Sequence, residues 1–200
     1  MRKVSCAIRQ LGATSHSVTG SRQNEDFYAT DPNALRTFLE QTDIEKYLSN
    51  NIWECACGMG HLSEVLASRG YNVYSTDLIN RHYKHFNETI DFLNCPTHFH
   101  NGDIITNPPY KYAKDFINKA MELLDTGRYC IMLLKLVFLE SMSRKELFKK
   151  YPPKYVYVSR SRIMCAKNGD FDKYDSSAVA FGWYVWQKGF IGEPVIRWID

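Results

Sequence analysis

The sequence of 200 residues contains no apolar run that approaches the length needed to cross a membrane. Its first segment turns polar after a few residues and has no apolar signal core, so we expect a cytoplasmic protein. It also lacks a Gly/Ser-rich linker, a low-complexity segment and a repeat of fixed period. With 44% hydrophobic and 24% charged residues, the chain can bury a core, and we expect one domain.

The sequence has no pattern typical of a metal site. Its cysteines form no C-x-x-C pair and no Cys/His zinc spacing, and three of them fall in predicted buried strands, so we expect reduced thiols. They are Cys6, Cys55, Cys57, Cys95, Cys130 and Cys165. His98, His100 and Asp103 belong to a predicted loop without a fourth ligand at diagnostic spacing. We interpret the two histidines as ordinary surface residues and expect no bound metal.

The net charge of +3 is distributed unevenly along the chain. Between Lys111 and Lys173 there are 14 Lys and Arg residues against 7 Asp and Glu residues, whereas the rest of the chain is net acidic. A charge run is commonly a solvated face, but this one begins directly after an Asn-Pro-Pro-Tyr turn. A positive excess at that place would suit a polyanionic partner such as nucleic acid.

Strand-like and helix-like segments alternate from about residue 31, which is typical of a mostly parallel sheet covered by helices. Asp31 and Pro32 begin the first predicted helix, because Asp caps helices and Pro suits their first turn. We predict helices over 31–41, 61–70 and 112–125, a further helix before 90–93, and strands over 51–57, 71–77, 103–106 and 129–139.

Two alternating, aromatic-rich segments, 154–163 and 177–189, are interpreted as an antiparallel strand pair at one edge of the sheet. The polar segment 164–176 joins them, and its length favours a functional loop. Residues 1–23 are predicted to form a variable arm, and 24–200 the domain. The predicted class is therefore α/β, a single Rossmann-like domain whose mostly parallel sheet carries an antiparallel C-terminal pair.

A glycine loop follows the first central strand. Glu54 lies in that strand, and Gly58 and Gly60 lead into the next helix, where a ligand could lie close against bare backbone. Asp77 ends the following strand, where an acid accepts hydrogen bonds from ribose hydroxyls in dinucleotide folds. Taken alone, the glycine loop could be an ordinary helix start and Asp77 an ordinary surface aspartate. Nicotinamide and flavin enzymes also have a strand, glycine loop and helix in this order.

The stretch DIITNPPY begins as a buried strand and stops at two consecutive prolines. Such a turn is an ordinary strand end, because proline cannot donate to the ladder. At the carboxyl end of a parallel strand, however, the same turn would present an amide, two prolyl carbonyls and an aromatic ring to a ligand. The residues concerned are Asn107, Pro108, Pro109 and Tyr110.

Taken together, the segments ECACGMGHLSEVLASRGYNVYSTD, DFL and NPPY resemble those of class I S-adenosylmethionine-dependent methyltransferases. The resemblance covers about residues 24–190 and is to the amino-methylating group that includes DNA adenine-N6 methyltransferases of phage and restriction type. It implies a class I methyltransferase domain with S-adenosylmethionine as cofactor. The cofactor-binding residues that it implies are Phe27, Tyr28, Thr30, Glu54, Ala56, Gly58, Gly60, Asp77, Asp91 and Phe92. Ala56 stands where many relatives have glycine, and Asn107 where the bacterial DNA enzymes often have Asp.

The catalytic role of the turn follows from the chemistry of a conjugated amino group, which is a poor nucleophile. The Asn107 side-chain oxygen and the Pro108 carbonyl would accept its two N–H bonds and leave the lone pair facing the methyl sulfonium. Pro109 would keep the turn rigid, and the Tyr110 ring would stack on the planar substrate. This mechanism needs neither a metal nor a covalent intermediate.

The Asn-Pro-Pro-Tyr motif alone does not identify the substrate. The compact form resembles phage and prophage enzymes, which favours adenine N6 of DNA over RNA and a bacterial or phage-infected cell. A protein glutamine N5-methyltransferase and a non-catalytic nucleic-acid or partner-binding module, alone or in an oligomer, are the alternatives. No segment is long enough for a target-recognition domain, so 164–176 is the candidate replacement. Stacking and phosphate contacts are expected from Lys111, Tyr112, Lys114, Arg160, Arg162 and Lys167.

Overall fold

The computed structural model describes residues 28–96, 100–167, 169–171 and 179–200. The predicted arm 1–23 lies outside these residues. The helices are α1 (Pro32–Glu40), α2 (His61–Ser68), α3 (Ala113–Leu123) and α4 (Lys145–Lys150), and the short 3-10 turns are η1 (Ile44–Lys46), η2 (Tyr110–Tyr112), η3 (Leu136–Leu139) and η4 (Met142–Arg144). The strands are β1 (Tyr28–Thr30), β2 (Asn51–Glu54), β3 (Asn72–Asp77), β4 (Glu88–Thr89), β5 (Asp103–Thr106), β6 (Tyr129–Lys135), β7 (Tyr155–Ser159), β8 (Cys165–Lys167), β9 (Phe181–Gln187) and β10 (Val195–Ile199).

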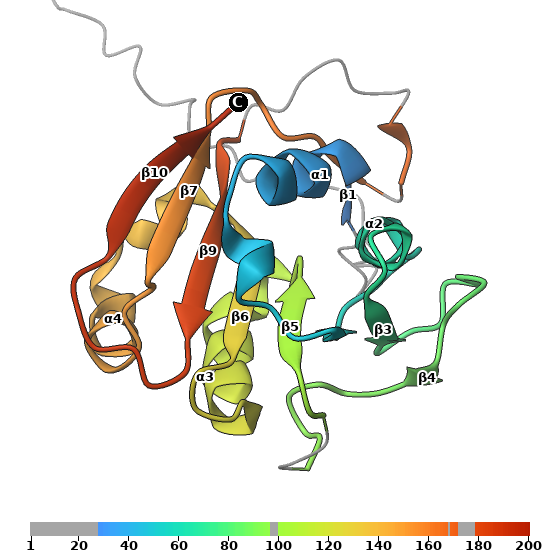
Figure 1. The fold of residues 1–200 in the computed structure, drawn as a ribbon, viewed down its shortest axis with the longest axis horizontal. Coiled ribbons are helices and arrows are strands. Elements are labelled where there is room, and N and C mark those ends of the chain that lie inside the picture. The colour runs from blue at the N-terminus through green and yellow to red at the C-terminus, as the bar shows by residue number, and fades with distance from the viewer. Residues whose placement is uncertain (1–27, 97–99, 168, 172–178) are drawn as a thin grey trace, which may run out of the picture.

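An 8-stranded sheet in the order β10-β7-β9-β6-β5-β2-β3-β4 forms the centre of the molecule (Figure 1). Strand β9 runs antiparallel to its neighbours β6 and β7, and the other neighbouring pairs are parallel. Strands β1 and β8, far apart in the chain, form a separate antiparallel pair. The α/β class, the mostly parallel sheet and the antiparallel β7–β9 pair are confirmed.

The predicted place of the β7–β9 pair at one edge is wrong. Strand β10 lies outside β7 and pairs with it in parallel, so β7 and β9 are both interior. The sequence hides β10 because four of its five residues are exposed, which leaves no alternation of buried and solvated side chains to detect. The long connection 164–176 also contains a strand, since β8 lies within it.

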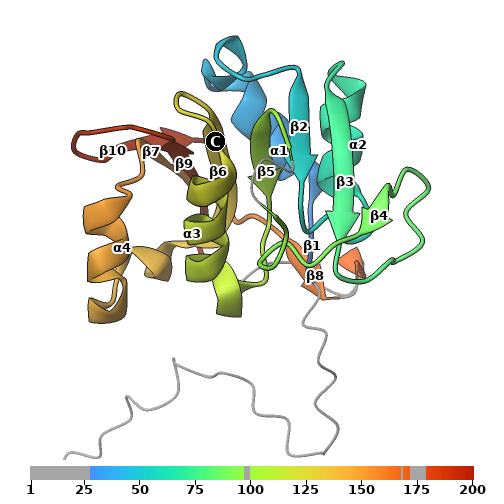
Figure 2. The ribbon, with the colours of Figure 1, turned by 90° about the horizontal axis from the view of Figure 1, so that it is seen from below.

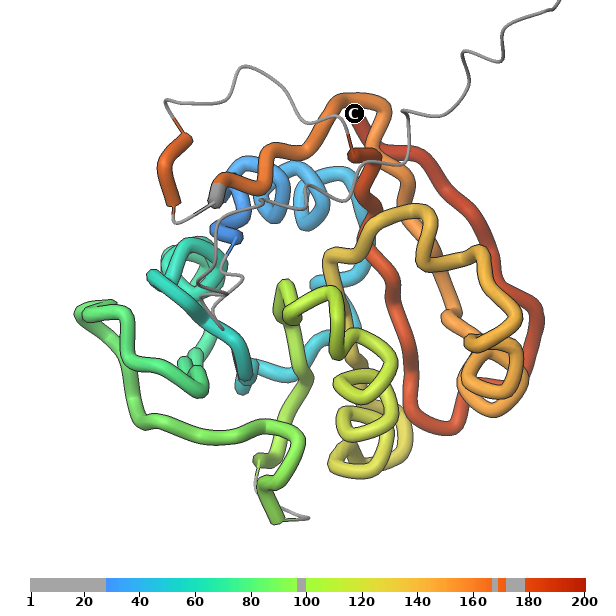
Figure 3. Tube along the Cα trace, turned by 180° about the vertical axis from the view of Figure 1, so that it is seen from behind, coloured from blue at the N-terminus to red at the C-terminus, as the bar shows by residue number. Residues whose placement is uncertain are grey.

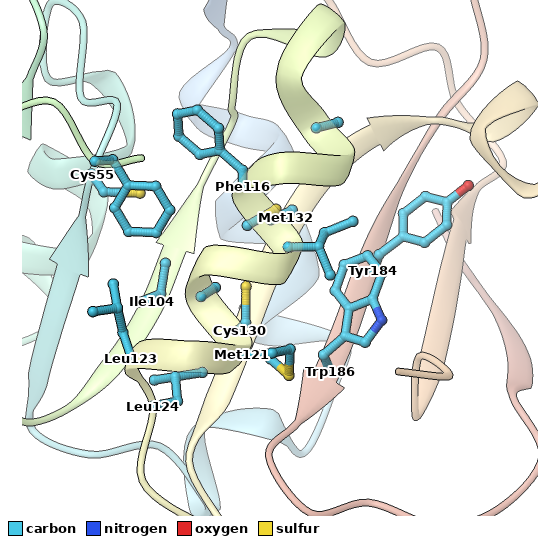
Figure 4. Packing of buried hydrophobic residues seen from close by; sticks show 14 of the residues in the cluster. Cys55, Ile104, Phe116, Met121, Leu123, Leu124, Cys130, Met132, Tyr184 and Trp186 are labelled. Atoms are coloured by element: carbon cyan, nitrogen blue, oxygen red, sulfur yellow. The ribbon is translucent and has the colours of Figure 1, made fainter. Parts of the chain in front are cut away.

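The helices cover the sheet on both faces, with α1 and α2 on one and α3 and α4 on the other (Figures 2 and 3). Successive residues of the central strands therefore pack into different cores: Ile104 lies under α3, whereas Ile105 lies under α1 and α2. Figure 4 shows the core beneath α3, where Phe116 and Met121 of the helix meet Met132 and Trp186 of the sheet. Burial on both faces explains the continuous apolar sequence of β6.

Two predicted helix boundaries are confirmed. Asp31 caps α1, because its carboxylate accepts the backbone N–H of Asn33 at 2.9 Å. Gly70 follows α2 with φ of +90°, a left-handed conformation that glycine adopts without strain.

The helix predicted before 90–93 is wrong, and the described chain between β3 and β4 is irregular. Side chains there bond to nearby backbone groups in ways that compete with a helix. Asn80 accepts the backbone N–H of His82 at 2.8 Å, and His82 itself has φ of +61°. Strand β6 is also shorter than predicted, because the chain turns into η3 after Lys135.

Asp103 ties together three parts of the chain at the start of β5. Its buried carboxylate accepts the backbone N–H of Ser49 at 2.5 Å and that of Tyr129 at 2.6 Å. Burial raises the pKa of this carboxyl, and the two N–H bonds oppose that rise. The residue is therefore structural and is not available as a metal ligand.

Replacing Asp103 by asparagine should lower the free energy of unfolding by about 1 to 3 kcal/mol, because an amide N–H would face a backbone donor in the interior. Urea unfolding followed by tryptophan fluorescence would measure the loss. Asp125→Asn changes an exposed aspartate and should leave the unfolding midpoint nearly unchanged. Equal midpoints for the two variants would contradict this role.

Candidate functional site

The predicted glycine loop, Asp77 and the Asn-Pro-Pro-Tyr turn lie at the carboxyl ends of β2, β3 and β5, and β1 and β8 lie at the same edge of the sheet (Figure 2). The glycine loop crosses from β2 toward β3, and the backbone N–H of Gly58 donates to Asp77 Oδ2 at 2.8 Å. Asp77 is half-buried and also accepts the backbone N–H of Ile79. The loop and the acid are thus held as one unit.

Gly60 is glycine for a reason that the sequence does not reveal. Its φ is +82°, and a Cβ built at this position would lie 2.3 Å from the Tyr83 ring. The close approach is made by the protein's own aromatic side chain, which covers the start of α2. The sequence predicts that a ligand lies against the bare backbone of this loop. At Gly60 the group that lies against the backbone is the Tyr83 ring.

Glu54 connects the glycine loop with α2 and β3 from inside the protein. Its carboxyl group is buried and hydrogen-bonded to the Ser63 hydroxyl, which lies 2.7 Å from the Ser75 hydroxyl. Burial raises the pKa of Glu54 to about 8. At neutral pH this carboxyl is therefore mostly protonated, and it positions the loop.

The two polar atoms of the Asn107 side chain, Nδ2 and Oδ1, differ in their hydrogen bonding. Its Nδ2 donates to Thr30 Oγ1 at 2.8 Å and to the Tyr28 carbonyl at 3.4 Å. Its Oδ1 is buried and has no hydrogen-bond partner among the residues that the structure describes. A buried acceptor without a donor is uncommon in folded proteins because it loses water without compensation. The arrangement leaves Oδ1 able to accept an N–H from a ligand.

Strand β1 supplies the residues that fix this orientation. Tyr28 and Thr30 belong to β1, which is paired with β8 in the register Tyr28–Lys167 and Thr30–Cys165. The backbone N–H of Asp31 continues the pairing by donating to the Met164 carbonyl at 3.0 Å. Thr30, predicted near the cofactor, is thus in direct contact with Asn107 of the Asn-Pro-Pro-Tyr turn.

Replacing Thr30 by valine should lower the rate of catalysis, since the nearly isosteric side chain removes the acceptor that orients the Asn107 amide. We expect a loss of about tenfold in kcat, which corresponds to one net hydrogen bond, with little change in KM. Thr30→Ser keeps the hydroxyl and should retain the rate. Equal loss in both variants would indicate a packing role.

The Tyr110 ring is enclosed by side chains from four other elements. Its hydroxyl lies 3.5 Å from Cys165 Sγ, and its centroid is 5.6 Å from that of Phe181 and 6.3 Å from that of Tyr28. The Lys135 ammonium stands 4.8 Å from the ring centroid. Burial raises the pKa of the Tyr110 phenol well above its ordinary value, so the group is neutral at physiological pH.

Lys135 is a site residue that the sequence reasoning missed. It ends β6, which places it at the same edge of the sheet as Asn107. The available signal was a single lysine inside the apolar run YCIMLLKLVFL. A cation at that point of a buried segment requires a partner, and here the partner is the Tyr110 ring.

The remaining cofactor predictions fare unevenly. Phe92 is buried in the core, with its ring centroid 4.8 Å from that of Phe116 and 5.1 Å from that of Trp53. These core contacts explain an apolar aromatic residue at this position without a cofactor. Asp91 is exposed and accepts the Asn94 amide at 2.7 Å. Ala56 is half-buried in the glycine loop. Phe27 lies outside the described residues.

Most of the predicted substrate contacts follow the carboxyl ends of parallel strands. Lys111, Tyr112 and Lys114 are exposed after β5, and Arg162 is exposed after β7. Arg160 is also exposed there and forms an ion pair with Asp200 at 2.8 Å. The side chain of Lys167 lies outside what the structure describes, as do residues 168 and 172–176 of the predicted recognition loop 164–176.

Within the described ranges no group of three or more His, Cys, Asp or Glu residues could hold a metal ion. His98 is outside those ranges, and His100 lies with its ring parallel to that of Tyr74, at 8° and 6.1 Å between centroids. The described cysteines are free thiols: Cys55, Cys57, Cys95, Cys130 and Cys165. No helix in the described part of the chain is long and apolar enough to span a membrane.

Solved structures share this fold although no family model and no curated protein matches the sequence. A Lactococcus lactis protein proposed to be a hemolysin aligns with a TM-score of 0.59 and 13% identity, over 82% of this chain and 91% of its own. A proposed class I S-adenosylmethionine-dependent methyltransferase of Listeria monocytogenes aligns with a TM-score of 0.54 and 13% identity, over 82% and 63%. A proposed RNA methyltransferase of Pyrococcus horikoshii gives 0.52 and 14%, over 80% and 82%. These likenesses show a Rossmann-like methyltransferase fold.

Proposed function

We infer that this fold serves an S-adenosylmethionine-dependent methyltransferase that acts on the N6 amino group of adenine in nucleic acid, with DNA favoured. The observation that carries the inference is the Asn107 amide, whose Nδ2 is bonded to Thr30 while its buried Oδ1 has no partner in the described part of the chain. An acceptor held in this way at the end of a parallel strand suits a substrate that brings its own N–H donors.

The residues present fit the proposed cofactor. The half-exposed Asp77 carboxylate is an acceptor suited to ribose hydroxyls, and the Gly58–Gly60 loop would lie under the methionine part. The bound group would supply an activated methyl on a sulfonium. Glu54 and Ser63 would act indirectly, by holding the loop in place.

The chain's own residues would then orient the acceptor. Asn107 Oδ1 and the Pro108 carbonyl would accept the two N–H bonds of the amino group, which draws the nitrogen toward a tetrahedral geometry and frees its lone pair. Tyr110, held between Lys135 and Tyr28, would border the planar ring. Positioning of this kind can account for much of a rate enhancement.

Nucleic acid is supported as the substrate by the exposed cations around the turn, among them Lys111, Lys114 and Arg162. One structure with this fold is described as a proposed RNA methyltransferase, which agrees with nucleic acid in general. The preference for DNA rests on the resemblance of the loop, acid and NPPY segments to phage-type and prophage-type enzymes.

The experiment is to incubate the protein and S-adenosylmethionine with plasmid DNA, single-stranded DNA, ribosomal RNA and a protein extract, and to identify methylated products by mass spectrometry. N6-methyldeoxyadenosine would support the proposal. Methylation of RNA alone, or of glutamine, would keep the mechanism and change the substrate. Failure of S-adenosylmethionine to bind in calorimetry would refute an enzyme and favour a binding module.

A further inference from the structure

Beyond the catalytic turn, the segment 136–144 presents apolar side chains to solvent at the carboxyl end of β6. Val137 is 59% exposed, Leu139 42% and Met142 83%. We call these three residues the apolar tip. Tyr112, 43% exposed, belongs to the η2 turn of the neighbouring connection.

The apolar tip is held in place by an arginine. The Arg144 guanidinium donates to the Phe138 carbonyl at 2.7 Å, to the Val137 carbonyl at 3.1 Å and to the Glu140 carbonyl, and it stacks 4.7 Å above the Phe138 ring. Ser141 has φ of +137°, an unfavourable conformation for a residue other than glycine. Exposed apolar side chains on a rigid segment are typical of a binding surface. Contact with solvent alone would not favour apolar side chains at these positions.

Two contacts connect the apolar tip with the catalytic turn. Lys135, which immediately precedes the segment, lies over the Tyr110 ring. Lys114, in the first turn of α3, donates to the Ser143 carbonyl at 3.4 Å. A ligand that extends from Asn107 along this edge of the sheet would therefore reach the apolar tip.

The charges that flank the apolar tip indicate the chemistry of its partner. In the two segments joined by these contacts, residues 110–115 and 135–146, cations outnumber acids by five to three. The cations are Lys111, Lys114, Lys135, Arg144 and Lys145, and the acids are Asp115, Glu140 and Glu146. Apolar side chains among cations suit a polyanion with flat, apolar faces, which describes unpaired nucleobases on a phosphate backbone.

We propose that the apolar tip binds unpaired bases next to the base being methylated, while the surrounding lysines contact the phosphates. This inference rests on the proposed function and names the form of its substrate, a single strand or an opened duplex. The contact would favour unpaired over paired DNA, because the apolar side chains meet base faces only after the bases unstack.

The test measures binding of labelled single-stranded oligonucleotides by fluorescence anisotropy in the presence of S-adenosylmethionine. One oligonucleotide carries bases, and a second has the same backbone with abasic sites beside the central adenine. The double variant Val137→Ser/Met142→Ser, called the apolar-tip variant, replaces the two most exposed residues of the apolar tip. The control Ile191→Ser/Val195→Ser replaces two exposed apolar residues, 95% and 45% exposed, in the β9–β10 connection and at the start of β10, at the other end of the sheet.

Wild type and control should bind the base-containing strand about tenfold more tightly than the abasic strand, as expected for stacking of one to two bases. The apolar-tip variant should lose this preference and keep the weaker, salt-dependent binding of the backbone. Equal preference in the apolar-tip variant would overturn the inference, as would a wild type that binds both strands alike.

The measurement separates this inference from the proposed function, since it detects binding and not methyl transfer. Adenine methylation with an unchanged base preference in the apolar-tip variant would leave the function intact and refute the role of the apolar tip. A base preference that depends on the apolar tip, without methyl transfer to adenine, would support the role of the apolar tip and refute the proposed function.

Discussion

Replacing Asn107 by alanine should lower the rate of methyl transfer by at least about 10²-fold, the effect of removing one preorganised hydrogen-bonding group from an active site. The amide has Nδ2 bonded to Thr30, and its buried Oδ1 has no partner within the described ranges, so the variant removes the acceptor that we propose for the substrate. The loss should appear in kcat, because this contact strengthens as the amino nitrogen becomes tetrahedral. Single-turnover assays on an adenine-containing strand would measure it.

The affinity of Asn107→Ala for S-adenosylmethionine should remain close to that of wild type in calorimetry, since the side chain is proposed to touch only the acceptor. Asn101→Ala, an exposed asparagine at the other end of β5, is the matched control and should keep full activity. A variant at Asn107 that retains most of its activity would show the proposed mechanism to be wrong.

Replacing Glu54 by glutamine should make the protein more stable at alkaline pH. Burial raises the pKa of Glu54 to about 8 from its ordinary value of 4.5, so the folded state binds a proton that the unfolded state releases. The resulting stabilisation is fully present below pH 4.5 and is lost progressively as the pH rises to 8. Glutamine is neutral at every pH and does not incur this loss.

The expected difference is roughly 3 to 5 kcal/mol in favour of Glu54→Gln above pH 8, since one pKa unit corresponds to about 1.4 kcal/mol, and close to zero at pH 4.5. Urea unfolding of the protein without added cofactor at several pH values would measure it. Glu146→Gln, an exposed glutamate of α4, should follow the pH dependence of wild type. Parallel curves for Glu54→Gln and wild type would mean that Glu54 is ionised in the folded protein.

Much of the fold could be predicted because local patterns specify it. The caps of α1, the apolar stripe of α3 and the proline stop after β5 each depend on a few neighbouring residues. The order of strand, glycine loop, acid and NPPY turn then predicts that Glu54, Asp77 and Asn107 meet, since carboxyl ends of parallel strands share one edge.

Other features depend on partners distant in the sequence, and local patterns do not contain them. The contact of Thr30 with Asn107 requires β1 to pair with β8, and the role of Lys135 requires a ring from the NPPY turn. Strand β10 has too few buried residues to show a period, and the segment after β3 has side-chain bonds to its own backbone that replace a helix.

The β1–β8 pair has a consequence for the order of assembly. Tyr28 and Lys167 are partners in that pair, so the closure that orients Asn107 spans most of the chain between them. Contacts of such long sequence separation form slowly, because loop-closure entropy is lost before they contribute. During synthesis, the glycine loop and the NPPY turn emerge well before β8. We therefore expect the Asn107 amide of the growing chain to acquire its fixed orientation only after β8 has emerged.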